Sequence, residues 1–339
     1  MAVIQTMDFR QSLRSNRLRT AIVIVLFIAI YVGIGLLVDV TMCTEKYPTV
    51  PIETILYALF TFTITPLATI SMCFIAAISI LVTYAYYDKL MLLGTEYHEV
   101  RPDDFESPEE AKLYHVVEEM KIAAGLNFMP KVYIIEANYM NAFASGYSEQ
   151  SAMVAITRGL MQKLDRDELQ AVMAHELSHI RHGDIKLTLT ATLLANLSII
   201  VIDIFFRNLF YSRRSSNSRS SSQFAFVVIL LRFLLPIITM ILLLYLSRKR
   251  ELMADAGCVE LMRNNQPLGR ALVKISDDYD THREEYKTAN ENTAHENVRR
   301  SAYLFDPTAA DIKSLASAAD IFSTHPSLEE RLKALGYKK

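Results

Sequence analysis

Two long runs without a charged side chain constrain this chain more than any other feature. The first extends from Thr20 to Val38 and the second from Thr54 to Tyr87. A helix needs about 20 apolar residues to cross a bilayer, so each run can span one. The second run exceeds that length, and we expect its helix to tilt or to continue beyond the bilayer. Because 51% of all residues are also hydrophobic, the chain is predicted to be an integral membrane protein.

A cluster of basic residues before the first run predicts its orientation. The cytoplasmic flanks of spanning helices are enriched in lysine and arginine, so we expect the N-terminus in the cytoplasm and a return of the chain to that side near Asp88. A cleaved signal peptide is the alternative, but the run is longer than a usual signal core and no small-residue cleavage site follows it. The basic residues are Arg10, Arg14, Arg17 and Arg19.

Charge and cysteine content argue against several other classes of protein. The net charge of -2 shows no basic excess, and we find no nucleic-acid-binding motif, so nucleic acid is not an expected partner. The three cysteines, Cys43, Cys73 and Cys258, are far apart in the sequence. They indicate neither a disulfide framework nor a zinc site made of cysteines.

A polar segment from about Asp88 to Lys186 has the mixed composition of a folded soluble domain. Its first helix is predicted to follow Ser107, which can cap the helix, while Pro108 takes the first helical position. Acidic residues in the first turn support this start, and the apolar rhythm then runs to Gly125. The sequence therefore predicts a helix between Ser107 and Gly125.

Two short strands and a second helix are predicted further along the same segment. Lys131 to Ile135 and Met153 to Thr157 are short, rich in β-branched residues and bounded by turn or polar residues, which is typical of strands in a small sheet. A helix is predicted to begin at Asp165, where the side chains of Asp165 and Glu168 can cap the first turn reciprocally. This second helix carries the motif described below.

Two further apolar stretches, Leu187 to Phe206 and Phe224 to Leu246, are less uniform than the first pair. Polar or charged residues interrupt both, so spanning is possible but carries an energetic cost. The connecting loop has four arginines and no acid, which conflicts with placing it outside the cell. The hairpin therefore either crosses the membrane twice or lies partly in the interface. Beyond Arg250 the chain is polar again, and Asp277 to Arg300 is expected to form a solvated insertion or a lid.

The segment His175-Glu176-Leu177-Ser178-His179 matches the H-E-x-x-H motif of zinc peptidases. Four residues along a helix advance it by ~6 Å and rotate it by ~40°, so both imidazoles project from one face and can bind one cation. Glu176 lies beside the open metal position, where it could take a proton from a zinc-bound water and deliver it to a leaving amine. The apolar residues around the motif argue against an ordinary exposed helix.

A catalytic zinc needs three protein ligands, so the motif requires a third one from elsewhere. The best candidate is Glu251, with Asp255 four residues later on the same helical face, where it could accept the N–H of a ligand histidine. His182 is a rival third ligand, but the sequence favours its interpretation as a polar residue that ends the helix before Gly183. Glu251 can meet the two histidines only if both ends of the apolar hairpin lie on one side of the membrane.

Four sequence blocks resemble the HtpX family of membrane zinc endopeptidases, relatives of the CaaX prenyl proteases. The blocks occur in the family's order. The resemblance covers nearly the whole chain, including two apolar segments before the catalytic region and two after the motif helix. The blocks are Asn141 to Ala144 (NAFA), Ala171 to Asp184 (AVMAHELSHIRHGD), Ser247 to Asp255 (SRKRELMAD) and His325 to Arg331 (HPSLEER).

The resemblance implies a gluzincin fold, Glu251 as third ligand, a cytoplasmic active site and a role in membrane-protein quality control. By similarity, Asn141 and Ala142 contact a substrate backbone that adds as a strand beside the cleft. His325 and Arg331 match positions at the cleft, where a donor or cation can stabilise the oxyanion of the attacked carbonyl. The structural alternatives for these two segments are an ordinary loop and a helix-capping sequence.

We therefore predict a mainly α integral membrane protein with four apolar helices and a gluzincin-type zinc protease domain that carries a small β-sheet. The expected partners are one Zn²⁺ per chain, misfolded or membrane proteins as substrates, and the bilayer of the bacterial inner membrane. The expected organisation is a membrane region with two spanning helices at 1–88, a first catalytic part at 89–186, a membrane hairpin at 187–246 and a second catalytic part at 247–339.

Two other functions would fit a membrane protein with such a motif. In a scaffold or transporter the zinc would be structural or cargo, and its site would be closed by four ligands or lie inside the spanning helices. A catalytically dead adaptor would lack Glu176 or one of the ligands. Here the motif helix lies outside the apolar runs and keeps Glu176 and the ligands, so the sequence favours the endopeptidase.

Overall fold

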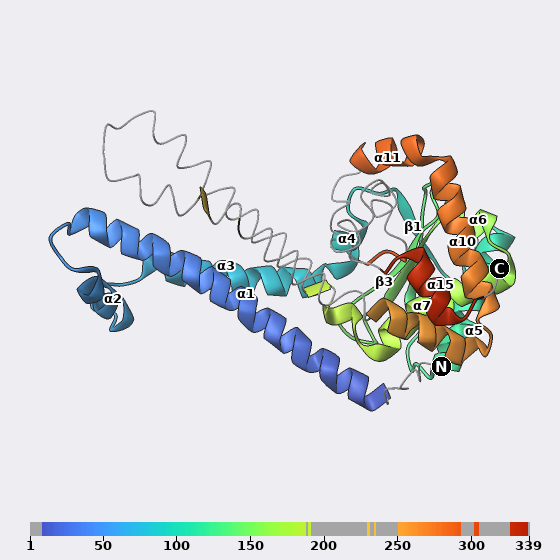
Figure 1. Cartoon of the computed structure of the whole chain (residues 1–339), viewed down its shortest axis with the longest axis horizontal. Helices are drawn as coiled ribbons and strands as arrows, with labels where there is room; N and C mark the ends of the chain where they lie inside the picture. Colours follow the sequence, from blue (N-terminus) through green and yellow to red (C-terminus); the bar gives the residue numbers. More distant parts are fainter. Residues whose placement is uncertain are drawn as a thin grey trace. The chain divides into compact units, whose positions relative to one another are not determined.

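The computed structural model describes residues 9–187, 189–190, 229–230, 234, 250–292, 302–304 and 326–337. This part of the chain is mostly helical with one small mixed sheet, as predicted (Figure 1). It divides into two compact units. We call them the apolar unit (Thr20–Ala85 and Thr190–Ile241) and the sheet unit (Met1–Arg19, Tyr86–Leu189 and Leu242–Lys339). The predicted hairpin at 187–246 lies almost entirely outside the described residues.

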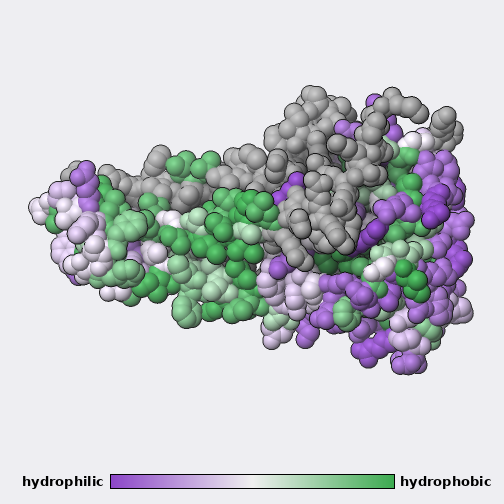
Figure 2. Space-filling view, turned by 90° about the horizontal axis from the view of Figure 1, so that it is seen from below, coloured by the Kyte–Doolittle hydropathy of each residue, from purple (hydrophilic) through white to green (hydrophobic). Residues whose placement is uncertain are grey.

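The apolar unit is built from long helices with hydrophobic surfaces. In the part of the chain that the structure describes, one stretch, Ile24–Thr44, is long and apolar enough to cross a membrane, and Leu67–Val82 is a shorter apolar helix. Figure 2 shows hydrophobic side chains gathered on the surface of this unit. Its helices are α1 (Phe9–Lys46), which belongs to this unit from Thr20 onward, α2 (Ile52–Phe60) and α3 (Leu67–Ala85).

The second apolar run does not form the single tilted helix that its length predicts. Helix α2 ends at Phe60, and α3 begins only at Leu67, directly after Pro66. The start of α3 is capped by Asp39 of α1, whose carboxylate accepts from the backbone N of Ala68 at 2.9 Å and of Thr69 at 2.8 Å. Because proline cannot continue a helix and Asp39 satisfies the amides of a new one, the run breaks at this point.

The four strands of the sheet unit are arranged in the order β1-β2-β4-β3. Strands β2 and β4 are parallel, and the other two pairings are antiparallel. The two predicted strands are confirmed, with their predicted bounds, as β2 and β4. Strand β3 takes up most of the NAFA block and lies at one end of the sheet. The bounds are Tyr97–Val100 for β1, Lys131–Ile135 for β2, Ala142–Ser145 for β3 and Met153–Thr157 for β4.

Both helices predicted in the polar segment are confirmed, and their ends follow from local chemistry. Helix α5 starts after Ser107, which caps it, and α7 starts with a capping box between Asp165 and Glu168. Each ends before a left-handed glycine, Gly125 at φ 69° and Gly183 at φ 66°. The helices of this unit are α4 (Tyr87–Leu92), α5 (Pro108–Ala124), α6 (Arg158–Lys163), α7 (Arg166–His182), α10 (Gln266–Thr281), α11 (Arg283–Asn292) and α15 (Leu328–Leu335).

Helix α7 lies at the centre of the sheet unit, in contact with α5, α10 and β3. Its apolar residues Ala171, Val172 and Met173 are completely buried and belong to the main core. The buried carboxylate of Glu168 ties α7 to α10, because it accepts from Lys274 Nζ at 2.6 Å. The motif histidines are therefore carried by a helix that is held on several sides.

The first part of the predicted charged insertion at 277–300 is helical. It begins in the last turn of α10 and continues through α11. Tyr286 of α11 is 3% exposed, and its hydroxyl receives a hydrogen bond from Lys163 Nζ at 3.1 Å. This part is therefore packed against the sheet unit rather than fully solvated, while residues 293–300 lie outside the described part of the chain.

Candidate metal centre

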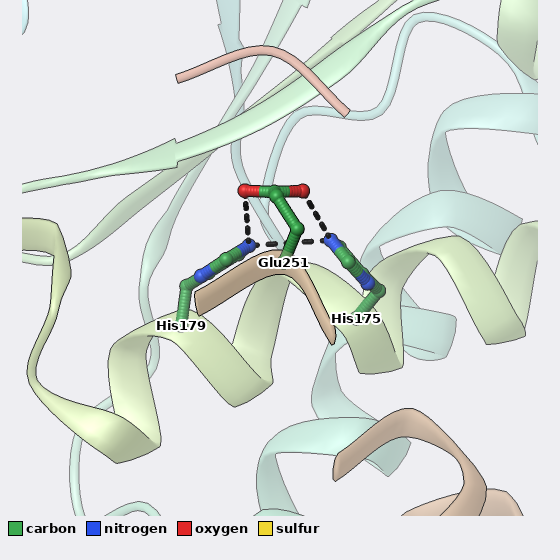
Figure 3. Close-up of side chains that lie close together, drawn as sticks. All are labelled: His175, His179 and Glu251. Carbon is green, nitrogen blue, oxygen red and sulfur yellow. Dashed lines mark hydrogen bonds and ion pairs between the residues drawn. The ribbon is translucent and has the colours of Figure 1, made fainter. Parts of the chain in front are cut away.

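Three potential ligands converge on one point between α7 and the helix of residues 250–262 (Figure 3). His175 and His179 lie one turn apart on α7, and their Nε2 atoms are 3.2 Å from each other. Glu251 faces both rings: its Oε2 lies 3.6 Å from His175 Nε2, and its Oε1 lies 3.7 Å from His179 Nε2. The structure thus brings together the residues that the sequence predicts as the metal site.

These separations fit a zinc ion. Two atoms that bind zinc tetrahedrally at ~2.0–2.1 Å lie ~3.3 Å apart, close to the three distances found here. Two imidazoles and one carboxylate are also the ligand set of a catalytic zinc with an open fourth position. The geometry and the chemistry of the donor set therefore both suit this metal.

Each histidine is also held through its second ring nitrogen. His175 Nδ1 lies 2.9 Å from Asp255 Oδ1, the contact predicted for Asp255. His179 Nδ1 lies 3.0 Å from Asp184 Oδ2. Such carboxylates fix the ring orientation and direct Nε2 towards the metal. The prediction missed Asp184, although an acid directly after the helix-ending Gly183 was a signal for it.

A glycine allows the two helices of the site to approach closely. A Cβ atom at Gly257 would lie 2.6 Å from Ser178 Oγ and 2.8 Å from Ser178 Cβ, closer than side chains tolerate. Ser178 lies between the two histidines on α7, and Gly257 lies six residues after Glu251 in the sequence. The absence of a side chain at Gly257 thus helps to bring Glu251 within reach of both imidazoles.

Glu176 is a buried acid with an unusual environment. It is 1% exposed, and neither carboxylate oxygen has a hydrogen-bond partner among the described residues. Burial raises the pKa of Glu176, although the nearby histidines act in the opposite direction. A carboxylate with a raised pKa is suited to accept and later return a proton near neutral pH.

The electrostatics of the site favour a bound cation. Burial by itself lowers the pKa of His179, but the carboxylates of Asp184 and Glu251 outweigh it and raise the pKa to about 9. The ligand histidines are thus surrounded by carboxylates that stabilise positive charge. A divalent cation would provide that charge while leaving the imidazoles neutral.

Comparison with known proteins identifies the family. The model of peptidase family M48 matches residues 107–339, a range that contains every residue of the metal centre. The chain belongs to peptidase family M48. It is therefore a metalloendopeptidase, and the peptidases of this family use zinc.

Relatives agree with this assignment and with the predicted resemblance to HtpX proteases. The Protease HtpX homolog of Helicobacter pylori is 39% identical over 328 residues, which cover 97% of this chain and 98% of the relative. That of Dictyoglomus thermophilum is 35% identical over 254 residues, covering 74% and 76% of the two chains. Among solved structures, S. mikatae Ste24p matches with a TM-score of 0.47 and 18% identity, over 94% of this chain and 66% of that chain.

In this M48 chain Arg331 is a buried partner of the metal centre. Its Nε and Nη2 donate to the two oxygens of Asp255 at 2.9 and 2.6 Å, and its Nη1 donates to the carbonyl of Leu304 at 2.7 Å. Burial tends to raise the pKa of Asp255, but Arg331 and His175 hold it below its ordinary value. Arg331 thereby keeps Asp255 ionised and aligned with His175.

The other residues that the sequence predicts for the site lie in different places, and one of them is outside the described part of the chain. Asn141 directly precedes β3 and accepts from the backbone N of Thr157 at 3.0 Å. Arg331 lies on α15, which does begin with a capping box as the structural alternative for this block predicts. His325 lies outside the described residues. His182 is absent from the group of three ligand atoms and lies against Gly257 instead.

Proposed function

We propose that this M48 metalloendopeptidase is a zinc enzyme of the membrane that hydrolyses peptide bonds in misfolded or membrane proteins. One Zn²⁺ per chain would be held by His175, His179 and Glu251, with Glu176 as the base. The observation that carries the proposal is the convergence of three ligand atoms, from His175, His179 and Glu251, within 4.8 Å of one another. Two of them come from α7, which also carries the buried acid Glu176, and the Glu176 carboxylate has no hydrogen-bond partner among the described residues.

The proposed mechanism assigns a distinct task to each side chain of the site. When bound, zinc would act as a Lewis acid: it would polarise the substrate carbonyl and lower the pKa of water so that it can lose a proton and attack near neutral pH. Glu176 accepts the proton of the attacking water and passes it to the leaving amine. Asp255 and Asp184 hold the two imidazoles in the tautomer that directs Nε2 to the metal.

We also propose that substrate binds along β3. Asn141 and Ala142 would contact an extended peptide that adds to the sheet, which is a common mode of peptide recognition at the edge of a sheet. The position of β3 at the end of the sheet supports this role. His325 and Arg331 are proposed to stabilise the oxyanion, although the contacts of Arg331 with Asp255 also suit a positioning role.

Measurements of zinc content and hydrolysis should show whether Glu251 or His182 is the third ligand. Replacing Glu251 with alanine removes one of three ligands, so we expect a sharp fall in bound zinc and loss of hydrolysis. Replacing His182 with alanine should leave both near normal. Elemental analysis of detergent-purified protein measures the zinc, and cleavage of an unfolded membrane protein, with and without added zinc, measures activity. The opposite result for the two variants would make His182 the ligand and overturn the assignment of Glu251.

The active site is proposed to face the cytoplasm, in a chain that crosses the bacterial inner membrane with four apolar helices. The basic residues before the first run support a cytoplasmic N-terminus, and an even number of crossings returns the chain to that side. A single cysteine introduced at Lys339, in a background without the native cysteines, should therefore be protected from an impermeant thiol reagent in intact cells. Labelling from outside would refute this topology, and labelling after permeabilisation is the control.

A further inference from the structure

Residues 303 and 304 pair with the outer edge of β3. Phe143 and Tyr303 form an antiparallel bridge, and the backbone N of Leu304 donates to the carbonyl of Ala142 at 2.8 Å. On its other side, the carbonyl of Leu304 accepts from Arg331 Nη1 at 2.7 Å. The backbone of Leu304 thus makes two hydrogen bonds: its N–H donates to Ala142 on β3, and its C=O accepts from Arg331 beside the metal centre.

Both of these groups are ones that the proposed function assigns to substrate. Ala142 is proposed to bind the substrate backbone, and Arg331 is proposed to contact the attacked carbonyl region. We propose that Leu304 stands in for a substrate residue in the resting enzyme, and that a peptide must displace Tyr303 and Leu304 from β3 before it is cleaved. This proposal rests on the proposed function, and the experiments below are chosen to separate the two.

The remaining polar groups at this point of β3 are already engaged, so a peptide cannot simply add next to Leu304. The backbone N of Asn141 donates to Thr157 Oγ1 at 2.9 Å, and its carbonyl accepts from the backbone N of Thr157 at 3.0 Å. The backbone N of Ala142 donates to Asn141 Oδ1 at 3.0 Å. The carbonyl of Ala142 therefore becomes accessible to a peptide strand by exchange with the N–H of Leu304.

The exchange leaves the number of hydrogen bonds nearly constant. One backbone N–H replaces another on Ala142, and one carbonyl replaces another on Arg331, so these terms largely cancel. What remains is the hydrogen bond between the hydroxyls of Tyr303 and Tyr139, 3.2 Å apart, and the burial of two side chains: Tyr303 is 2% and Leu304 is 1% exposed. A peptide must therefore offer comparable apolar burial to compete with the segment.

The side chain of Leu304 indicates the class of substrate that can do so. Leu304 belongs to the main hydrophobic core, and Tyr303 packs against Phe143 with 5.8 Å between ring centroids. A substrate residue in the place of Leu304 would occupy apolar surroundings. We therefore expect a preference for a large aliphatic residue at the substrate position that contacts Ala142 and Arg331.

A disulfide between β3 and this segment tests whether the segment must move. The bond from Leu304 to Ala142 flanks the Phe143–Tyr303 bridge, so that bridge is a non-hydrogen-bonded pair with Cα atoms ~4.5 Å apart. This separation is within the range of a disulfide. The variant combines Phe143→Cys and Tyr303→Cys, with the exposed Cys73 replaced by serine to prevent mispairing.

Oxidation of this variant should lower hydrolysis of a short, soluble, leucine-containing peptide by more than about tenfold at unchanged zinc content, because the competent state is removed. Reduction of the same sample with a phosphine should restore it. An oxidised form as active as the reduced form would show that the segment need not leave, and would overturn the proposal. In that outcome peptide hydrolysis itself, and with it the proposed function, would stand.

Hydrogen exchange provides a second test that needs no cysteines. The same peptide is added to the Glu176→Gln variant, and exchange of individual amides is followed by mass spectrometry with fragmentation. We expect the Leu304 amide to lose protection, while the Thr157 amide, bonded on the opposite side of β3, stays protected. If the Leu304 amide kept its protection at saturating peptide, the proposal would be wrong, even if the cysteine pair impaired folding.

Discussion

Replacing Glu176 with glutamine should abolish measurable hydrolysis while leaving zinc binding and thermal stability close to those of the wild type. Glutamine keeps the size of the buried side chain but cannot accept the proton of the attacking water. Loss of general acid–base catalysis typically costs ~100- to 10,000-fold in rate, and we expect the upper end of that range. The measurements are the rate of peptide cleavage and the zinc content of the same preparation.

The matched control for this variant is Glu118→Gln. Glu118 has a side chain that is 52% exposed on α5, so its substitution removes the same charge away from the metal centre. We expect its rate to match the wild type. Cleavage by the Glu176 variant within a few-fold of the wild-type rate would rule out the proposed mechanism and would favour a structural or transported zinc.

Replacing Arg331 with methionine should destabilise the sheet unit strongly. The guanidinium and the Asp255 carboxylate form a buried pair, with side chains that are 3% and 2% exposed. Removing one partner leaves a buried charge without compensation, which typically costs ~3–5 kcal/mol. Thermal unfolding followed by tyrosine fluorescence measures the change, since the chain has 17 tyrosines and no tryptophan.

An exposed pair offers the control for Arg331. Arg166 Nη2 lies 2.6 Å from Glu119 Oε1, but the two side chains are 55% and 43% exposed. Such pairs contribute ~0–1 kcal/mol, so Arg166→Met should change stability little. Equal effects of the two substitutions would contradict the importance given to the buried pair.

Zinc binding by the Arg331 variant also distinguishes two roles of this residue. If Arg331 aligns Asp255 and thereby His175, the affinity for zinc should fall together with activity. If it acts mainly as a donor to the oxyanion, zinc binding should be nearly normal and the catalytic rate alone should fall. A chelator competition assay on the folded fraction measures that affinity.

Local patterns predicted the motif helix well because its determinants are close together in sequence. The capping box of Asp165 and Glu168, the glycine at its end and the spacing of His175 and His179 all lie within one helix. Glu251 was also predicted, from the need for a third ligand and from the family resemblance. These features depend on helix periodicity and on metal chemistry, which can be recognised without tertiary structure.

The features that the sequence did not predict depend on contacts between distant segments. The backbone N of Leu304 donates a hydrogen bond to the carbonyl of Ala142, which lies far away in the sequence. No periodicity in the sequence marks such a contact. The break before α3 had a signal in Pro66, but the cap from Asp39 depends on how two helices pack. Hydropathy alone counts apolar residues and cannot distinguish one long helix from two.

In the proposed membrane topology, Asp39 would set an order for the insertion of α1 and α3 into the bilayer. A carboxylate in an apolar helix is costly to transfer from water, and here its oxygens are satisfied by the first amides of α3. Because α1 leaves the ribosome before α3, the acid has no such partner while α1 is alone. The favourable moment for Asp39 to leave water is when α3 arrives, so the two helices would enter the bilayer together as a hairpin rather than one after the other.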